Sequence, residues 1–420
     1  MYNNIVLDIS IIVLKCRICS SDDLELVIDL GSLALTGVFL EDGKQAKKAP
    51  LVLKRCKNCG LVQLGHNYVE SELYGNTYGY ESHLNQSMVD HLQQKARTLE
   101  HKYLKSIPAA VVVDIASNDG TLLSGYKRDN LIKIGIDPLI DVVSDRYPLN
   151  ALKIRNFFSS QEYWKVQNKS ANLVTSLSVI YDLTDPVGFA KQIYEILEED
   201  GIWHFEQSYL PLMIETLSYD TICHEHLLYL SMHDIKKILE LTGFKIIEAS
   251  MNGVNGGSIA ISAIKTNKLL LEDPFVNYLI SSEIKNGILD GSKIANFAKV
   301  VMEHSQDFRL LIIKYKELGY DVIGLGASTK GNVLIQIAGL DSNQISAIGD
   351  VNPRKFGKQT PGSAIPIFSE KNLLENASEL TIAVVFPWHF RAGIVNNLEK
   401  FIMTGRKLLI PLPRIEVVSA

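Results

Sequence analysis

The stretch AAVVVDIASNDGTLL, residues 109–123, decides the fold of this chain. It begins with a short β-branched run that is typical of a buried parallel strand, and it ends in the apolar start of a helix. The tight turn between them consists of small and turn-prone residues, which suits close approach of a ligand. The turn departs from the G-x-G-x-x-G pattern, because Ala116 and Asn118 replace glycines and only Gly120 is kept. The segments that follow must therefore decide what this loop binds.

Strand and helix patterns continue to alternate after this turn. The run IKIGID, residues 132–137, predicts a second strand and ends in Asp137, 23 positions after Asp114. Rossmann-like folds hold ribose hydroxyls with a carboxylate at this place, so Asp137 is the predicted ribose ligand, unless it only caps a helix. The next predicted elements are strands at 171–176 and 201–205 and a helix at 186–197. We predict an α/β sheet that binds its ligand across the carboxyl ends of its strands.

A long amphipathic helix is predicted to link this sheet to a second α/β unit. Its apolar face consists of Ile294, Phe297, Val301, Phe308, Leu311, Tyr315 and Leu318. The next strand begins at Asp321 and runs into the turn Gly324-x-Gly326-x-x-x-x-Gly331, where a helix start and Lys330 together suit a diphosphate. Strand–helix packing alone is the other role open to these glycines. Later strands are predicted at 345–348, 381–386 and 407–411, with polar loops at 350–357 and 387–390.

Four of the five cysteines form two C-x-x-C pairs, Cys16 with Cys19 and Cys56 with Cys59. Two such pairs can close a tetrahedral sulfur shell around zinc and leave no open position, so the predicted metal is structural. It would stabilise a small N-terminal module, since the segment 24–53 is too short to hold a core alone. Redox pairs or disulfides are the alternatives, which are disfavoured in a cytoplasmic chain without a secretion signal.

Length and charge restrict the partners of the chain. Its 420 residues predict two or three domains, and its formal net charge of -5 shows no excess of Lys and Arg for a role on nucleic acid. The apolar run at 5–14 contains Asp8 and Ser10 and is too short to span a bilayer. We therefore expect a cytoplasmic monomer or homodimer that binds small molecules, neither nucleic acid nor a membrane.

Residues 218–231, SYDTICHEHLLYLS, place Cys223, His224, Glu225 and His226 in consecutive positions. A metal site, a nucleophile with its base, a proton-transfer group and a polar turn packed on another domain are all open. The H-E-H spacing lacks the i, i+4 pair of a metalloprotease helix, and no helix N-terminus is present to activate the thiol. In an extended strand the two histidines would share one face, with the glutamate on the other.

Motifs along the chain closely resemble those of the sugar C-methyltransferases. They are the two C-x-x-C pairs, VDIASNDG (113–120), FEQSYLP (205–211), CHEH (223–226), GASTKGN (326–332), VNPRKFG (351–357) and PWHF (387–390). The resemblance covers the chain from about Cys16 onward. It implies a zinc-binding domain at 1–70, a class I Rossmann-like domain for S-adenosylmethionine (SAM) at 71–265, and a smaller Rossmann-like domain at 266–420 that helps to hold a nucleotide sugar.

The resemblance also implies where the ligands bind. The expected cofactor residues are Asp114, Ala116, Ser117, Asn118, Asp119, Gly120, Asp137, Pro138, Ser178, Tyr78 and Tyr80. The expected substrate residues are Asn255, Gly256, Ser328, Thr329, Lys330, Asn332, Asp350, Asn352, Lys355, Trp388 and His389. The turn around Asn255 would line the sugar pocket or serve only as a hairpin turn. Trp388 and His389 would contact the nucleotide base, although an aromatic residue after a strand is more often buried.

Carbon methylation requires a nucleophilic carbon, which a sugar provides when a ketone lets a neighbouring proton leave as an enolate. His226 is the expected base, with Glu225 beside it to orient the ring and favour the imidazolium. His224, Tyr78 and Tyr80 are candidates for stabilising the enolate oxygen. The chain departs from the family pattern at Cys223, where a Tyr is usual, and at Asp182, where a His is usual. Substrate and proton handling are expected to differ accordingly.

The first hypothesis is therefore SAM-dependent methylation, at C3, of a dTDP- or GDP-linked 4-keto deoxysugar. An NAD-dependent nucleotide-sugar oxidoreductase or epimerase is the second hypothesis. A non-catalytic zinc-ribbon protein that binds a protein or nucleic acid is the third. That protein would gather basic residues around the zinc pairs, whereas only scattered ones occur here: Lys47, Lys48, Lys54 and Arg55.

Overall fold

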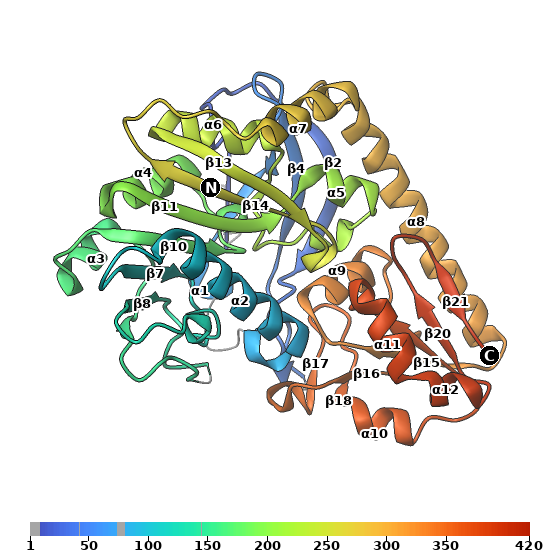
Figure 1. Cartoon of the computed structure of the whole chain (residues 1–420). Coiled ribbons are helices and arrows are strands. Elements are labelled where there is room, and N and C mark those ends of the chain that lie inside the picture. The colour runs from blue at the N-terminus through green and yellow to red at the C-terminus, as the bar shows by residue number, and fades with distance from the viewer. Residues whose placement is uncertain (1–8, 42, 74–79, 144) are drawn as a thin grey trace, which may run out of the picture.

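The computed structural model describes residues 9–41, 43–73, 80–143 and 145–420. Three sheets follow one another along most of the chain, and the long helix α8 (Ser292–Glu317) runs beside them and leads into the C-terminal unit (Figure 1). This helix confirms the amphipathic pattern, because Ile294, Phe297, Val301 and Phe308 are all buried. Leu318, which follows the helix, is exposed. None of the helices described is long and apolar enough to cross a membrane.

The central sheet has seven strands in the order β13-β14-β11-β10-β7-β8-β9. Its strands are β7 (Val111–Ile115), β8 (Ile132–Ile136), β9 (Leu152–Ile154), β10 (Ala171–Leu177), β11 (Leu197–Ser208), β13 (Phe244–Asn252) and β14 (Ser258–Lys265). All run parallel except β14, which is antiparallel to both of its neighbours. The strand order reverses between β7 and β10, which is where open α/β sheets form a ligand crevice.

Alternating residues of the central strands pack on the two faces of this sheet. On one face, Val112, Leu173 and Ile202 pack with α2 (Gln86–Leu99). On the other, Val113, Val174 and Trp203 join the main core, which also contains apolar residues of α4 (Pro186–Ile196) and α6 (Met232–Thr242). Helices on both faces explain why β7 is buried along its whole length and is apolar except at Asp114.

The N-terminal sheet is antiparallel, with strand order β12-β5-β4-β2. Its strands are β2 (Leu24–Ala34), β4 (Lys48–Cys56), β5 (Val62–Leu64) and β12 (Leu228–Tyr229). A separate ribbon pairs β1 (Ser10–Ile12) with β6 (His66–Tyr68). Strand β12 comes from far along the chain and begins two residues after His226, so the CHEH stretch is joined to this sheet.

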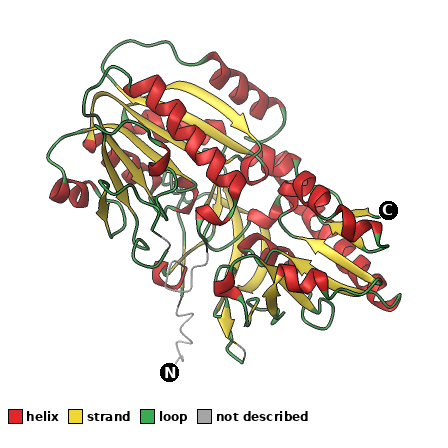
Figure 2. Ribbon diagram, turned by 60° about the horizontal axis from the view of Figure 1, so that its bottom comes forward, coloured by secondary structure: helices red, strands yellow, loops and turns green. Residues whose placement is uncertain are grey.

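The C-terminal sheet has six strands in the order β18-β16-β15-β19-β20-β21, with only β21 antiparallel. The strands are β15 (Asp321–Leu325), β16 (Ala347–Asp350), β18 (Ile367–Ser369), β19 (Thr381–Val385), β20 (Lys407–Ile410) and β21 (Glu416–Val418). The helices of this unit are α9 (Thr329–Ile337), α10 (Glu370–Glu375), α11 (Arg391–Asn397) and α12 (Glu399–Met403). In Figure 2 the strands of this sheet lie among helices, as in the central unit. Strand β17 (Lys358–Gln359) pairs with β3 (Leu40–Glu41) and joins this unit to the N-terminal part.

Candidate active site

The four paired cysteines come together in the N-terminal part. Their Sγ atoms all lie within 4.8 Å of one another, with 3.5 Å between Cys16 and Cys59 and 3.6 Å between Cys19 and Cys56. A tetrahedral shell with Zn–S bonds of about 2.3 Å requires S–S separations of about 3.8 Å, so the cluster fits zinc with little adjustment. The predicted zinc site is confirmed. Because four thiolates fill the shell, the metal is structural.

The CHEH stretch is a turn between η5 (Tyr219–Thr221) and β12, and its side chains point into different surroundings. His224 is fully buried, donates from Nε2 to the Ala49 carbonyl oxygen at 3.1 Å, and contacts the Tyr68 ring edge-on. It therefore lies inside the N-terminal part. The expectation that it stabilises an enolate oxygen is wrong, and so is the shared face that an extended strand would give the two histidines.

The Glu225 side chain does not lie against the His226 ring, which it was expected to orient. Its Oε2 accepts a hydrogen bond of 3.4 Å from Thr36 Oγ1, and its Oε1 lies so close to Gly37 that a Cβ there would be 2.7 Å away. Burial raises the pKa of this carboxyl group. The predicted role of Glu225 in orienting the His226 ring is therefore wrong, because the side chain instead fastens the CHEH turn to the turn that follows β2.

A backbone carbonyl orients His226 instead. Nδ1 of the ring lies 2.8 Å from the Thr221 oxygen, and a carbonyl oxygen only accepts, so Nδ1 carries the hydrogen and donates. The neutral ring then has its lone pair on Nε2. Burial and the nearby Lys330 ammonium lower the pKa of His226 to about 4. At neutral pH the residue is therefore an uncharged base of fixed tautomer.

His226 lines a small cavity at the carboxyl ends of β10 and β11. Its ring packs on Tyr181, with centroids 4.3 Å apart, and Ser208, Tyr209 and Tyr229 line the same cavity. Tyr181 lies in η4 (Ile180–Asp182), directly after β10. The base therefore faces the end of the sheet where a cofactor is expected.

Cys223 and Asp182 are not among the residues that line this cavity. Cys223 is fully buried, and burial, together with the Glu225 carboxylate, raises the pKa of its thiol well above the usual value. A neutral buried thiol is a poor nucleophile, so the structure gives Cys223 no such role. Asp182 is partly buried and adds to the rise in the pKa of Cys223.

Lys330, which lies in α9 of the C-terminal unit, contributes a positive charge to this site. Its ammonium donates to the Asn255 carbonyl oxygen at 2.8 Å, and burial lowers its pKa while the Asp220 carboxylate opposes that change. Asp220 is fully buried, and its Oδ2 accepts from the Trp388 indole nitrogen at 2.8 Å. Among the described residues, its Oδ1 has no hydrogen-bond partner. A cation and a carboxylate from two units thus meet beside His226.

Two non-glycine residues with left-handed backbone mark the cofactor side of the crevice. Ala116 follows β7 with φ 54°, and Ser178 follows the neighbouring β10 with φ 60°. Both are exposed, although the strands before them are buried. Such backbone strain costs on the order of 1 kcal/mol or more per residue and concentrates at ligand sites. These residues fit a cofactor that contacts the backbone at adjacent strand ends.

Asp137 lies at the end of β8 beside them. Its carboxylate accepts from the Asn118 backbone nitrogen at 3.0 Å and from the Leu139 nitrogen at 2.7 Å. A carboxylate has about four acceptor positions, so it can still accept from two ribose hydroxyls. Asp137, the partly buried Pro138, Ala116, Asn118 and Ser178 are therefore the residues that would hold SAM.

Other predicted cofactor residues serve the loop itself. Asp119 is fully buried and accepts from Thr121 and His83, while Gly120 is required because a Cβ there would lie 2.7 Å from Tyr147. The remaining two are also internal, Asp114 accepting from Thr175 at 2.7 Å and Ser117 sharing a hydrogen bond with Tyr147. Burial raises the pKa of Asp114 to about 7. Direct cofactor contacts are therefore not supported for these four residues.

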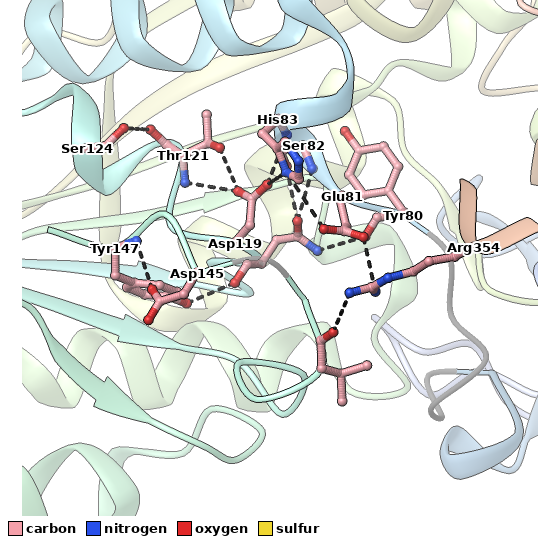
Figure 3. A network of polar contacts seen from close by, with 12 residues as sticks. Tyr80, Glu81, Ser82, His83, Asp119, Thr121, Ser124, Asp145, Tyr147 and Arg354 are labelled. Atoms are coloured by element: carbon pink, nitrogen blue, oxygen red, sulfur yellow. Dashed lines mark hydrogen bonds and ion pairs between the residues drawn. The ribbon is translucent and has the colours of Figure 1, made fainter. Parts of the chain in front are cut away.

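Residues 80–83, here called the cover segment, lie against the cofactor loop (Figure 3). The Ser82 backbone nitrogen donates to Asn118 Oδ1 at 3.1 Å, and Asn118 Nδ2 donates to the Tyr80 carbonyl oxygen at 3.2 Å. His83 donates to Asp119 Oδ2 from both its backbone nitrogen and its ring Nδ1, each at 2.9 Å. Tyr80 itself is 48% exposed. The other predicted tyrosine, Tyr78, lies outside the described residues.

Most of the predicted substrate residues lie at or after the carboxyl ends of β15, β16 and β19. Ser328 caps α9, Asn332 is buried and donates to the Thr36 carbonyl oxygen, and Asn352 caps the turn η7 (Pro353–Lys355). These three shape the loops rather than face an open site. Of the others, Thr329 and Lys330 begin α9, Asp350 ends β16, and Lys355 lies in η7 with its Nζ 3.2 Å from Asp350 Oδ2.

Trp388 corrects a further expectation. It is only 6% exposed, and its indole hydrogen is already donated to Asp220, so it does not stack on a nucleotide base. Its ring lies 3.1 Å from the place that a Cβ at Gly256 would occupy, which explains the glycine in the turn beside Asn255. His389 keeps an Nδ1 without a partner among the described residues, and burial lowers its pKa to about 3.

Sequence reasoning missed the residues that position the base and close the site. They are Thr36, Gly37, Thr221, Asp220, Tyr181 and, within the cover segment, Glu81, Ser82 and His83, whereas Tyr80 of that segment was predicted. Tyr181 and Asp220 flank recognised motifs and could have been found by their position. Thr221 lies five residues before His226 and acts through its backbone carbonyl, which no side-chain motif marks. The others act through contacts with distant parts of the chain, for which the local pattern gives no signal.

Three family models match consecutive parts of the chain. A zinc-binding domain matches residues 16–74, a methyltransferase domain matches 88–249, and the C-methyltransferase C-terminal domain matches 253–413. Over 414 residues, the chain is also 27% identical to the C-methyltransferase NovU of Streptomyces niveus, with 97% of each chain covered. The predicted fold class is confirmed, as are SAM and zinc as cofactors.

Solved structures that match part of the chain include methyltransferases. One is the magnesium protoporphyrin IX methyltransferase ChlM of Synechocystis PCC 6803 with bound SAM (14% identity, TM-score 0.33, 45% of this chain and 86% of that chain). Another is the plantazolicin methyltransferase BpumL (11% identity, TM-score 0.34, 43% of this chain and 85% of that chain). Together, the three family models cover far more of this chain than either structure does.

Proposed function

Since this chain is a SAM-dependent methyltransferase with the three domains of a C-methyltransferase, we propose that it methylates C3 of a nucleotide-linked 4-keto deoxysugar. When bound, SAM supplies an electrophilic methyl group. Carbon methylation additionally requires removal of a proton from the sugar carbon. The observation that supports this proposal is the fixed tautomer of His226, which leaves Nε2 unprotonated in a residue that lines the cavity at the carboxyl ends of β10 and β11.

His226 would take the proton from the carbon next to the ketone. The low pKa of this residue keeps Nε2 free of a proton at neutral pH, and the Thr221 carbonyl holds the ring in place during the transfer. The Lys330 ammonium, which lowers the pKa of His226 through its charge, would stabilise negative charge on the substrate. The charge that favours the enolate thus also keeps the base unprotonated.

The same arrangement supports the remaining proposals. We keep the division at 1–70, 71–265 and 266–420, with the dTDP- or GDP-linked substrate held by loops of the last domain. The cytoplasm remains the proposed location, because a reducing compartment preserves four zinc-binding thiolates. We propose no nucleic-acid partner and no membrane partner. The proposed oligomeric state is a monomer or a homodimer. A methyltransferase domain favours SAM over the NAD-dependent alternative.

Methyl transfer itself tests the proposal. The zinc-loaded protein is incubated with SAM that carries a ¹³C-labelled methyl group and with dTDP- and GDP-linked 4-keto deoxysugars in turn. One of the products should show the labelled methyl group on C3 by NMR. A labelled methyl group on oxygen or nitrogen, or no transfer to either substrate, would contradict the assignment.

The tautomer of His226 can be observed directly. In protein labelled with ¹⁵N-histidine, the His226 signal, assigned as the one missing from His226→Asn, should show protonated Nδ1 and bare Nε2 at pH 7. Because its pKa is lowered to about 4, the ring should stay neutral from pH 8 down to pH 5. Titration near the ordinary histidine pKa of about 6.5 would show that the site is more solvated than the structure indicates.

Lys330 is expected to contribute mainly to substrate binding. Replacing it with methionine removes the cation beside His226 and should weaken substrate binding by roughly 10-fold or more, as expected for a charge-assisted hydrogen bond. Steady-state KM and direct nucleotide titration measure the effect. Lys371→Met is the matched control, since Lys371 is 81% exposed and lies in α10. Equal KM values for the two variants would show that Lys330 does not contribute to substrate binding.

A further inference from the structure

Arg354 connects the C-terminal unit to both sides of the cofactor site. Its Nη1 lies 3.0 Å from Glu81 Oε1 of the cover segment, and its Nη2 donates to the Val142 carbonyl oxygen at 2.9 Å (Figure 3). Val142 ends the turn that begins at Asp137 and Pro138. One guanidinium therefore holds the cover segment and the predicted ribose turn at the same time.

The Glu81 end of this contact is largely buried. The Glu81 side chain is 4% exposed, and a buried carboxylate is costly unless a cation pairs with it. His83 lies on the other side of Glu81, with Nδ1 3.7 Å from Glu81 Oε2 and 2.9 Å from Asp119 Oδ2. A chain of polar contacts thus runs from Arg354 through Glu81 and His83 to Asp119 in the cofactor loop.

The backbone of Arg354 is fixed by the loop that is proposed to bind nucleotide. The Arg354 nitrogen donates to the Asn352 side chain at 3.0 Å, and Pro353 fixes the backbone between them. Lys355, the next residue, points the other way and donates to the Ala327 carbonyl oxygen at 2.7 Å. Adjacent side chains of the one short turn η7 therefore reach the two ligand sites.

We propose that Arg354 is a positioning residue that couples nucleotide binding in the C-terminal unit to SAM binding in the central unit. A nucleotide that orders the loops at 326–331 and 350–357 also orders η7, and Arg354 then braces the cover segment and the ribose turn. By reciprocity, SAM raises the affinity for nucleotide by the same factor. This inference rests on the proposed function, because that function places a nucleotide at these loops.

Calorimetric titration tests the coupling in the zinc-loaded full chain. The dissociation constant of S-adenosylhomocysteine is measured alone and with saturating thymidine diphosphate or guanosine diphosphate. In the wild-type protein, the nucleotide that binds should tighten the complex about fivefold or more, within the usual range of coupling. Arg354→Met should weaken S-adenosylhomocysteine binding alone by several-fold and make it independent of nucleotide.

Two further variants separate positioning from simple stabilisation. Arg406→Met removes an arginine that also donates to backbone carbonyls, those of Ala377 and Ser378, within the C-terminal unit. It should lower the melting temperature slightly and keep the coupling. Arg354→Lys can hold Glu81 or Val142 but lacks the fork that reaches both, so it should restore the coupling only in part.

The outcomes separate the two proposals. Unchanged coupling in Arg354→Met, or absence of coupling in a wild-type protein that binds both ligands, would overturn the role of Arg354. If neither nucleotide binds the wild-type protein, the proposed substrate is wrong and so is the coupling. The effect of Arg354→Met on S-adenosylhomocysteine alone then still shows whether Arg354 braces the cofactor site.

Discussion

Replacing His226 with asparagine is expected to lower kcat for methyl transfer by about 10³-fold, within the range for loss of a general base. The asparagine amide can still donate to the Thr221 carbonyl oxygen, as Nδ1 does in the native ring. It has no basic nitrogen in place of Nε2. The fold, the zinc content and the affinity for S-adenosylhomocysteine should therefore stay close to those of the wild-type protein, so that the loss belongs to the proton-transfer step.

His224→Gln is the matched control for this variant. The glutamine amide can replace Nε2 of His224 as donor to the Ala49 carbonyl oxygen, and the site is buried in the N-terminal part away from the cavity. Its kcat should remain within about tenfold of wild type, since only packing changes. If this variant loses as much activity as His226→Asn, or if His226→Asn keeps its activity, His226 is not the base.

Loss of zinc should have the second large effect. Replacing Cys56 with alanine opens the sulfur shell, and structural zinc sites of this kind contribute about 10 kcal/mol or more to folding. The N-terminal sheet should then unfold, with a fall in melting temperature of more than about 10 °C and loss of activity. Zinc content by native mass spectrometry should fall from one ion per chain to none.

Activity should fall with the zinc because this sheet holds the CHEH turn. Strand β12 pairs with β5, the Leu64 nitrogen donates to the Leu227 carbonyl oxygen at 2.9 Å, and Thr36 holds Glu225. Cys223→Ser is the control for zinc content, since the fifth cysteine lies outside the cluster and should leave one zinc bound. A Cys56→Ala protein that retained full activity without zinc would show that the active site does not depend on the metal.

The sequence was sufficient where local pattern and physical cause coincide. The β-branched runs before Ala116 and Lys330 predicted the central strands of two sheets, because strands buried on both faces need apolar residues throughout. The cysteine spacing likewise predicted the metal site, since two such pairs close one shell. These features depend on neighbours in the chain and on little else.

The site was less predictable, because its side chains are positioned by contacts with segments that are distant in sequence. Glu225 lies next to His226 in sequence, yet it contacts Thr36, and the carbonyl of Thr221 takes its expected place. Asp119 and Gly120 fit a cofactor motif, but Asp119 accepts a hydrogen bond from His83, and Gly120 leaves room for the Tyr147 side chain. A motif shows which loop lies at the site, whereas three-dimensional contacts decide which of its side chains face the ligand.

Hydrogen exchange at the sugar carbon tests the central claim most directly. The wild-type protein with S-adenosylhomocysteine, in deuterium oxide and without SAM, should replace the C3 hydrogen of the accepted nucleotide-linked 4-keto deoxysugar, as followed by NMR. His226→Asn should bind the same sugar and leave that hydrogen in place, because no base remains to remove it. Equal exchange by the two proteins, or none by a wild-type protein that methylates this sugar, would contradict proton removal by His226.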